Sequence, residues 1–330
     1  MNATHVVKAW GLILQGYQPN LSIEITRECP LRCPGCYAYG DTHLGGDVVL
    51  RELADFKVQA LIDGVLDLVR RQRPVHLSIV GGEPLVRYRE LDVLLPRLTA
   101  MGVHTQVVTS AVRPIPEAWA SIEKVQVCVS VDGLQPEHDA RRAPATYDRI
   151  LKHIKGQQVT IHCTITRQQS RQGYITAFTE FWAKRPDVKR IWFSLYTPQK
   201  GEQSAETLRP EDRGRVVAEM SALYLREPKL RDMIPSIVQG YLTPPRNPDE
   251  CIFAKTTACV SSDLKRVITP CQYGGDPDCT QCGCMASVGL DALGRRRLGG
   301  AVPIKAVFAA SLRVGDGVRR LRRSGQDAAV

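Results

Sequence analysis

Long apolar runs are absent from the 330-residue sequence, and no stretch approaches the roughly 20 apolar residues that a membrane-spanning helix needs. The first residues also lack the charged and apolar parts of a secretory signal peptide. Aromatic residues make up only 6% of the chain and are not interleaved with basic residues, so no RNA-binding module is evident. No internal repeat is visible. We therefore expect a cytoplasmic protein that does not act on nucleic acid.

Cysteine, in contrast, is abundant, with 11 residues that fall mostly into two groups. In a chain of cytoplasmic type, clustered cysteines favour metal ligation over disulfides. The formal net charge is +10, and much of it lies after residue 285. We expect a solvated, partly disordered basic tail. The alternative is a tail that contacts acidic lipid or a phosphorylated substrate.

The first cysteine group is Cys29, Cys33 and Cys36, with the spacing C-x3-C-x2-C. Three thiolates on one short loop can bind three irons of a cubane cluster and leave the fourth iron open to another ligand. A Gly-Gly-Glu-Pro turn at 81–84 follows directly after the apolar run 75–80. Taken alone, the thiols would also suit a structural zinc site.

The cysteine spacing and the Gly-Gly-Glu-Pro turn together resemble the radical S-adenosylmethionine (SAM) superfamily. The resemblance implies a catalytic [4Fe-4S] cluster on Cys29, Cys33 and Cys36, with SAM bound to the open iron. In this family one electron from the cluster cleaves SAM to a 5′-deoxyadenosyl radical, which abstracts hydrogen from the substrate. The resemblance extends over about residues 20–290.

Six strand-like runs alternate with helical stretches, which indicates an α/β protein with a parallel sheet. These runs are 21–26, 75–80, 104–109, 125–131, 159–166 and 191–196. Polar and apolar residues alternate along several of them, so one face is expected to line an interior chamber. The resemblance implies a partial (β/α)6 TIM-like barrel with a small Cys-rich extension. We expect domains at 1–245 (barrel), 246–290 (SPASM/twitch-like cluster domain) and 291–330 (basic tail).

The resemblance also assigns cofactor contacts. The Gly-Gly-Glu-Pro turn would bind the methionine amino group of SAM. A Ser-x-Asp-Gly motif begins at Ser130, and Arg142, about twelve positions later, would pair with the SAM carboxylate. A surface salt bridge is the alternative for Arg142. Tyr37 would contact the adenine, although Pro34 stands where relatives often carry an aromatic residue. The expected cofactor-binding residues are Tyr37, Gly81, Gly82, Glu83, Thr109, Ser110, Ser130, Asp132 and Arg142.

The second cysteine group lies within 34 residues and resembles the opening of SPASM and twitch domains, which hold auxiliary [4Fe-4S] clusters. It comprises Cys251, Cys259, Cys271, Cys279, Cys282 and Cys284. The sequence departs from the family pattern at Arg266, where a glycine is usual, and in the later spacing. We expect one auxiliary cluster. Its expected ligands are Cys259, Cys271, Cys279 and Cys282, with Cys251 or Cys284 as replacements. One full and one open cluster, or zinc on four thiols, are the alternatives.

Three further residues fall on the polar face that is expected to line the chamber. Cys128 is a candidate hydrogen-atom donor, and His162 or Tyr196 would hold the substrate or transfer a proton. Buried structural roles are the alternative. The sequence thus predicts a radical SAM oxidoreductase that abstracts hydrogen from a small-molecule, lipid or peptide substrate, reduced by a flavodoxin- or ferredoxin-type donor. A ribosomal-peptide maturase and a non-catalytic iron–sulfur or zinc protein are the alternatives.

Overall fold

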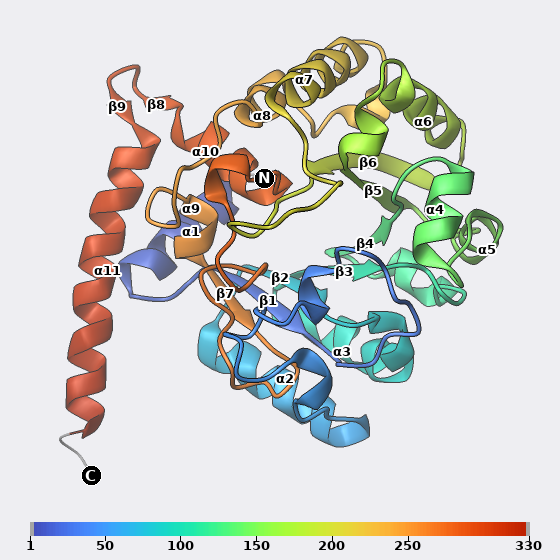
Figure 1. Ribbon diagram of the computed structural model, residues 1–330. Coiled ribbons are helices and arrows are strands. Elements are labelled where there is room, and N and C mark those ends of the chain that lie inside the picture. Colours follow the sequence, from blue (N-terminus) through green and yellow to red (C-terminus); the bar gives the residue numbers. More distant parts are fainter. Residues whose placement is uncertain (1–2, 328–330) are drawn as a thin grey trace.

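A curved parallel sheet forms the centre of the computed structural model, which describes residues 3–327 (Figure 1). Its seven strands run in the order β6-β5-β4-β3-β2-β1-β7, and every neighbouring pair is parallel. The strands are β1 (Asn20–Glu24), β2 (His76–Val80), β3 (His104–Thr109), β4 (Val125–Ser130), β5 (Val159–Ile165), β6 (Val188–Leu195) and β7 (Thr257–Val260). The sheet places the carboxyl ends of its strands along one rim.

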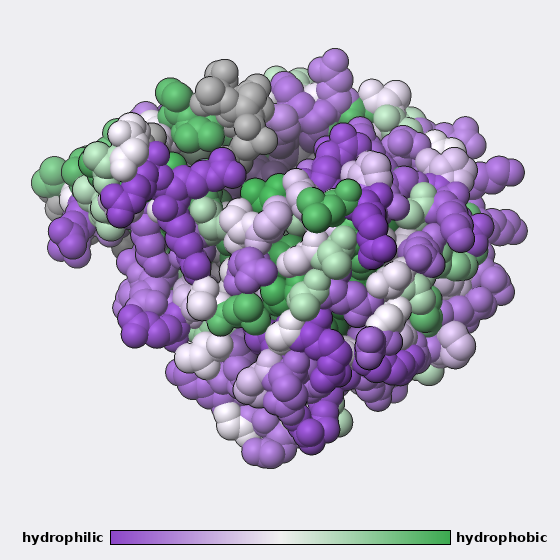
Figure 2. Space-filling model, turned by 90° about the horizontal axis from the view of Figure 1, so that it is seen from above, coloured by the Kyte–Doolittle hydropathy of each residue, from purple (hydrophilic) through white to green (hydrophobic). Residues whose placement is uncertain are grey.

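Helices cover the outer, convex side of this sheet (Figure 1). The α-helices that the structure describes are α1 (Ala3–Leu14), α2 (Val58–Gln72), α3 (Tyr88–Ala100), α4 (Gln135–Arg142), α5 (Tyr147–His153), α6 (Tyr174–Ala183), α7 (Pro210–Tyr224), α8 (Pro235–Gly240), α9 (Ile252–Thr256), α10 (Met285–Gly294) and α11 (Ile304–Asp327). Helix α11 does not cover the sheet but stands to one side of it, packed on α1 and α10 (Figure 1). In α2, Leu61, Val65 and Leu68 are buried at helical spacing. Seen from above, the surface is largely hydrophilic with smaller hydrophobic areas, as expected for helices whose apolar sides face inward (Figure 2).

The strands alternate between the two sides of the sheet as the sequence predicts. In β5, Ile161, Cys163 and Ile165 are at most 1% exposed and belong to the main hydrophobic core. His162 and Thr164, on the opposite side, are only partly buried. One side of the sheet therefore packs under the helices, and the other is polar and accessible. The predicted partial TIM-like barrel is confirmed.

A seventh strand was not predicted. Strand β7 comes from the Cys-rich segment and pairs with β1, with Cys259 opposite Ser22. All four residues of β7 are buried, so they show no alternation that would mark a strand in the sequence. Because of this pairing, the Cys-rich segment continues the same sheet as the barrel strands.

The C-terminal segment contains an ordered helix where a solvated, partly disordered tail was expected. Helix α11 packs against α1, where the rings of Trp10 and Phe308 stack with centroids 5.3 Å apart. The indole Nε1 of Trp10 donates to Ser311 Oγ at 2.6 Å. At Gly315 a Cβ would lie 2.0 Å from the carbonyl oxygen of Ile13, so only glycine permits this approach. Among the described helices, none is long and apolar enough to cross a membrane.

Candidate active site

The first cysteine group lies on the loop that follows β1, at the carboxyl rim of the sheet. Cys29, Cys33 and Cys36 are partly buried free thiols. Burial, together with the nearby Glu83, Cys33 and Cys36, raises the pKa of Cys29 to about 11. The three sulfurs are therefore close enough to influence one another. A bound metal would be needed to hold them as thiolates at neutral pH.

The Gly-Gly-Glu-Pro turn supports this loop through its backbone. The N–H of Gly82 donates to Thr26 O and that of Glu83 donates to Glu28 O, both at 2.8 Å. A Cβ on Gly82 would lie 2.2 Å from the Glu28 oxygen. Gly81 has φ of +112°, and a Cβ there would lie 2.8 Å from Glu24 Cα. Both glycines are required because the cysteine loop lies directly on the turn.

The Glu83 side chain is buried and joins the turn after β2 to the end of β3. It is 1% exposed and accepts hydrogen bonds from Leu85 N at 2.9 Å, from Ser110 N at 2.8 Å and from the Thr109 hydroxyl. Burial raises the pKa of Glu83, although these hydrogen bonds and Arg142 act against the rise. The carboxylate thus holds the rim together. Because both of its oxygens accept hydrogen bonds within the protein, the turn offers a ligand its backbone groups.

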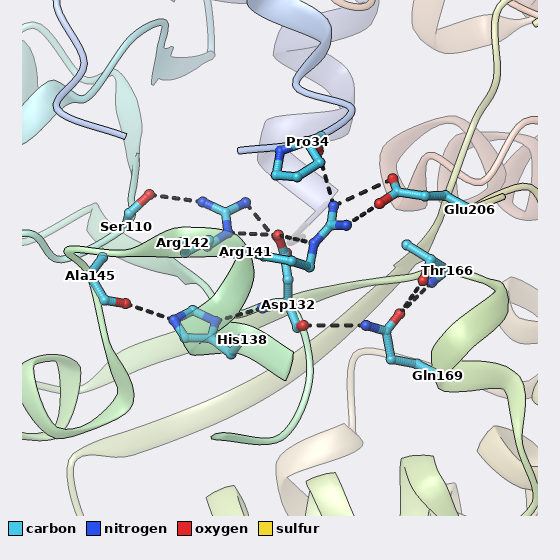
Figure 3. A network of polar contacts seen from close by, with 10 residues as sticks. All are labelled: Pro34, Ser110, Asp132, His138, Arg141, Arg142, Ala145, Thr166, Gln169 and Glu206. Atoms are coloured by element: carbon cyan, nitrogen blue, oxygen red, sulfur yellow. Dashed lines mark hydrogen bonds and ion pairs between the residues drawn. The ribbon is translucent and has the colours of Figure 1, made fainter. Parts of the chain in front are cut away.

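An arginine–aspartate network lies beside the cysteine loop (Figure 3). Arg142 Nε donates to Asp132 Oδ2 at 2.7 Å, and its Nη1 donates to Ser110 Oγ at 2.8 Å. Burial acts to raise the pKa of Asp132, but Arg142 and Arg141 outweigh it and the net shift is downward. Burial raises the pKa of Cys33, and the charge of Arg142 acts against that rise. Three predicted cofactor contacts, from the ends of β3, β4 and α4, therefore meet at one point.

Arg141 and Glu206 complete the network and are absent from the predicted site residues. Arg141 forms an ion pair with Glu206 and donates through Nη2 to the carbonyl oxygen of Pro34 at 3.1 Å. Pro34 lies between two cysteines of the loop, so Arg141 ties the loop to a segment far away in the sequence (Figure 3). Glu206 lies in irregular backbone after β6, where no motif marks it.

His138 holds this network from below (Figure 3). Its Nδ1 accepts from Asp132 N at 3.0 Å, which leaves Nε2 to donate to Ala145 O at 2.7 Å. Burial lowers the pKa of His138, consistent with this neutral tautomer. His138 thus fixes the backbone of Asp132 without reaching the cysteine loop.

The predicted chamber residues lie on the polar side of the sheet or, for Tyr196, just beyond the end of β6. Ser130 and His162 are partners in the β4–β5 register. His162 Nε2 lies 2.8 Å from Ser194 Oγ, and burial lowers the pKa of His162 to about 4. Cys128 is 1% exposed, and burial raises its pKa to about 12. Tyr196 donates to Glu202 Oε1 at 2.6 Å. His162 is therefore neutral, and Cys128 is a protonated thiol.

Tyr37, predicted to contact the adenine, packs toward the Cys-rich segment. Its ring makes an edge contact with Tyr273 (centroids 5.3 Å apart) and a tilted contact with His43 (5.6 Å). Burial raises the pKa of Tyr37, and Glu24 and the nearby cysteines add to the rise. Tyr37 thus lies between the two cysteine groups.

Five of the six cysteines in the second group line one cavity, together with Ser287 and Tyr273. These five are Cys251, Cys271, Cys279, Cys282 and Cys284. Cys259 lies outside the cavity lining. It is 2% exposed in β7 and packs in a small hydrophobic cluster with residues that include Leu44 and Ile268. The structure therefore groups Cys251 and Cys284 with three of the predicted ligands in the cavity lining. Cys259 is outside that lining but near enough to act on the pKa of Cys271.

Both cysteine groups offer only thiol donors to a cofactor. All the cysteines in the chain are free. Within residues 3–327, no three His, Cys, Asp or Glu side chains lie close enough to hold a single metal ion. In a cubane cluster each thiolate binds a different iron, so its ligands are spread around the cube. The donor set of both groups, thiols alone, fits an iron–sulfur cluster, and four thiolates would also suit zinc.

Comparisons with known proteins agree with this arrangement. Residues 23–164 match the model of the "Radical SAM superfamily". The "Mycofactocin maturase MftC" of Mycobacterium tuberculosis (strain CDC 1551 / Oshkosh) is 28% identical over 46% of this chain and 39% of its own length. The "PqqA peptide cyclase" of Xanthomonas campestris pv. campestris (strain B100) is 25% identical over 64% of this chain and 61% of its own length. The chain thus spans less than two thirds of these curated relatives.

Solved structures share the fold. Streptococcus suis SuiB bound to S-adenosylmethionine superposes with a TM-score of 0.53, at 18% identity, over 78% of this chain and 60% of SuiB. Native anSMEcpe with bound AdoMet gives a TM-score of 0.56 at 16% identity, over 77% of this chain and 74% of that chain. The predicted cofactors, a [4Fe-4S] cluster and SAM, are those of the matched superfamily. Residues 23–164 are therefore similar to the radical SAM superfamily, as the cysteine spacing and the Gly-Gly-Glu-Pro turn predict.

Proposed function

We propose that this protein is a radical SAM enzyme that reductively cleaves SAM and abstracts a hydrogen atom from its substrate. One observation carries the proposal. The free thiols of Cys29, Cys33 and Cys36 lie on a single loop at the carboxyl rim of the sheet, beside the Arg142–Asp132 pair. In barrels of this kind the carboxyl ends of the strands form the reaction site.

The roles of the residues follow from their positions. Cys29, Cys33 and Cys36 would hold the [4Fe-4S] cluster, which when bound supplies the electron that cleaves SAM to a 5′-deoxyadenosyl radical. Arg142, a planar two-pronged donor, would bind the SAM carboxylate by exchanging part of its contact with Asp132. The remaining backbone of the Gly-Gly-Glu-Pro turn would receive the methionine amino group. Thr109 is less available, because its hydroxyl already bonds to Glu83.

The Cys-rich segment would hold an auxiliary [4Fe-4S] cluster in a SPASM/twitch-like domain. The cavity that contains five of the six cysteines supports this, because a cluster needs four of them. Cys251 and Cys271 approach the cavity from separate segments, while Cys279, Cys282 and Cys284 come from one short stretch. An auxiliary cluster there would accept an electron from the substrate radical or position the substrate.

The substrate that we favour is a peptide. Two curated relatives are a maturase and a peptide cyclase, and the aligned region of the second extends over 64% of this chain. A small molecule or a lipid is the other class that the chamber would admit. His162 and Ser130, paired on the accessible side of the sheet, would contact the substrate. A flavodoxin- or ferredoxin-type protein would supply the electron.

The proposal is tested on anaerobically reconstituted full-length protein with SAM and dithionite, by chromatography of 5′-deoxyadenosine and by iron analysis. Wild type should form deoxyadenosine and contain about eight irons per chain, as expected for two cubane clusters. Cys33→Ala should abolish deoxyadenosine formation. Cys163→Ala, a core cysteine outside both groups, is the matched control and should remain active. An iron-replete wild type that forms no deoxyadenosine would favour a non-catalytic iron–sulfur protein.

A further inference from the structure

A buried arginine outside the Cys-rich segment points toward the second cysteine group. Arg213 in α7 is 9% exposed. Its Nη1 donates to the carbonyl oxygens of Tyr241 at 2.9 Å and Cys282 at 3.2 Å, and its Nη2 donates to Gln281 O at 2.6 Å. These three bonds use three of the five guanidinium N–H groups. They do not neutralise its charge, because all three acceptors are neutral carbonyls.

No carboxylate in the described part of the chain forms an ion pair with Arg213, although other buried arginines have such partners. Burial lowers the pKa of Arg213, and Asp278 is the carboxylate that acts against this shift, less strongly than Cys282 and Tyr241. Its oxygens, however, accept hydrogen bonds from Thr280 and Gln281. A buried, uncompensated charge is expensive, so an anion is expected close to Arg213.

The five-cysteine cavity supplies the place for that anion. Cys282 lines the cavity, and its backbone is bound to Arg213. Ser287 is 2% exposed, and its hydroxyl lies 3.2 Å from Cys251 Sγ. Ser287 also lies in the first turn of α10, whose N-cap is Cys284. Arg213 does not line the cavity, but its guanidinium binds the backbone of the Gln281–Cys282 wall. A cavity lined by thiols and a buried hydroxyl, beside a helix N-terminus and with a buried cation behind its wall, suits a negatively charged occupant.

Four thiolates around a [4Fe-4S] core carry a net negative charge, and one-electron reduction makes that charge larger. We propose that Arg213 is the counter-charge of the auxiliary cluster and raises its reduction potential. This role of Arg213 rests on the proposed auxiliary cluster. Arg213 would influence the cluster through its positive charge and not as a ligand of the iron. Electron uptake forms and breaks no bond. The nearby positive charge stabilises the reduced state more than the oxidised state.

The test uses full-length protein with Cys29→Ala, Cys33→Ala and Cys36→Ala, so that only an auxiliary cluster remains. The cluster is titrated anaerobically with dithionite and followed by EPR. Arg213→Met should lower the ratio of reduced to oxidised cluster at least tenfold at a fixed potential, a shift of about 59 mV for one electron. Arg213→Lys keeps the charge and should recover most of the shift.

Arg215→Met on the same helix is the matched control. Arg215 is 41% exposed and pairs with Asp212, so its loss should leave the potential unchanged. Loss of iron in Arg213→Met but not in Arg213→Lys would also support the counter-charge. Equal potentials in all variants, or equal iron loss with Met and Lys, would show that Arg213 only braces the Gln281–Cys282 backbone. If the variant with only Cys29, Cys33 and Cys36 replaced contains no cluster, the proposed auxiliary site itself is overturned, and the role of Arg213 with it.

Discussion

A single added methyl group at Gly82 should disable the cysteine loop. The Cβ of alanine at this position would lie 2.2 Å from the Glu28 oxygen and 2.7 Å from the hydroxyl of Tyr39. The first distance is more than 1 Å short of the 3.4 Å at which ordinary contact begins. The nearest atoms belong to backbone, which cannot rotate away as a side chain does. The cysteine loop must therefore move away from the turn.

The cost follows from what that movement breaks. The Gly82–Thr26 and Glu83–Glu28 backbone hydrogen bonds are both 2.8 Å long and both join the turn to the loop. Each contributes about 0.5–1.5 kcal/mol, and overpacking adds about 1–3 kcal/mol. We expect Gly82→Ala to lower the free energy of unfolding by about 2–6 kcal/mol. The displaced loop should also lose the iron of the catalytic cluster.

Urea unfolding and iron analysis on the same anaerobic preparation measure both effects. Gly214→Ala is the matched control, because a Cβ there meets nothing within 4 Å. Since Gly214 lies inside α7, alanine should stabilise the helix by about 0.5–1 kcal/mol. The reasoning is refuted if Gly82→Ala unfolds at the wild-type urea concentration and keeps its full iron content.

Three other predictions test the site. Glu83→Gln should destabilise the protein by about 1–3 kcal/mol in urea unfolding, because an amide nitrogen replaces one of the acceptor oxygens; an unchanged midpoint would contradict the bracing role. Replacing Cys279, Cys282 and Cys284 together by serine should remove about four irons per chain, because only two cavity thiols remain, while Cys259→Ser removes none; the reverse pattern would return Cys259 to the ligand set. Burial lowers the pKa of His162 from 6.5 to about 4, so the unfolded state binds the extra proton between these values. Stability should therefore fall as pH drops from 6.5 toward 4, and His162→Asn should reduce that fall when unfolding is followed across this range.

The parts of the molecule that the sequence predicted depend on local pattern. The six barrel strands show either alternation or continuous apolar runs, and each was located to within about three residues. The cysteine loop and the Gly-Gly-Glu-Pro turn are short motifs whose function depends on neighbouring residues. For such features the local sequence already contains the physical cause, whether a period of two or a glycine with positive φ.

The residues that were not predicted act through contacts distant in sequence. Glu206 pairs with Arg141 across 65 positions, and Arg213 reaches Cys282 across 69. Arg213 lies in a stretch rich in charged residues, which by itself is typical of an exposed helix. Its burial is decided by the packing of α7 against α8 and of α8 against α10, together with its bonds to Tyr241 and to the Gln281–Cys282 backbone. The sequence of α7 alone does not indicate which of its faces packs against the neighbouring helices.

The two cysteine groups are held together by one buried network, which makes them a single structural unit. His43 Nε2 lies 2.8 Å from Glu24 Oε1, and His43 Nδ1 lies 2.8 Å from the carbonyl oxygen of Tyr273. Both partners are acceptors, so the imidazole is held as a cation; burial opposes this, but the net shift of the His43 pKa is upward. Ser261 donates to the second oxygen of Glu24 at 2.5 Å. At Gly274 a Cβ would lie 1.9 Å from the carbonyl oxygen of His43. The segment after Cys36 and the segment after Cys271 thus touch backbone to backbone, and neither can shift without the other. A substitution in this network should therefore disturb both cysteine groups at once.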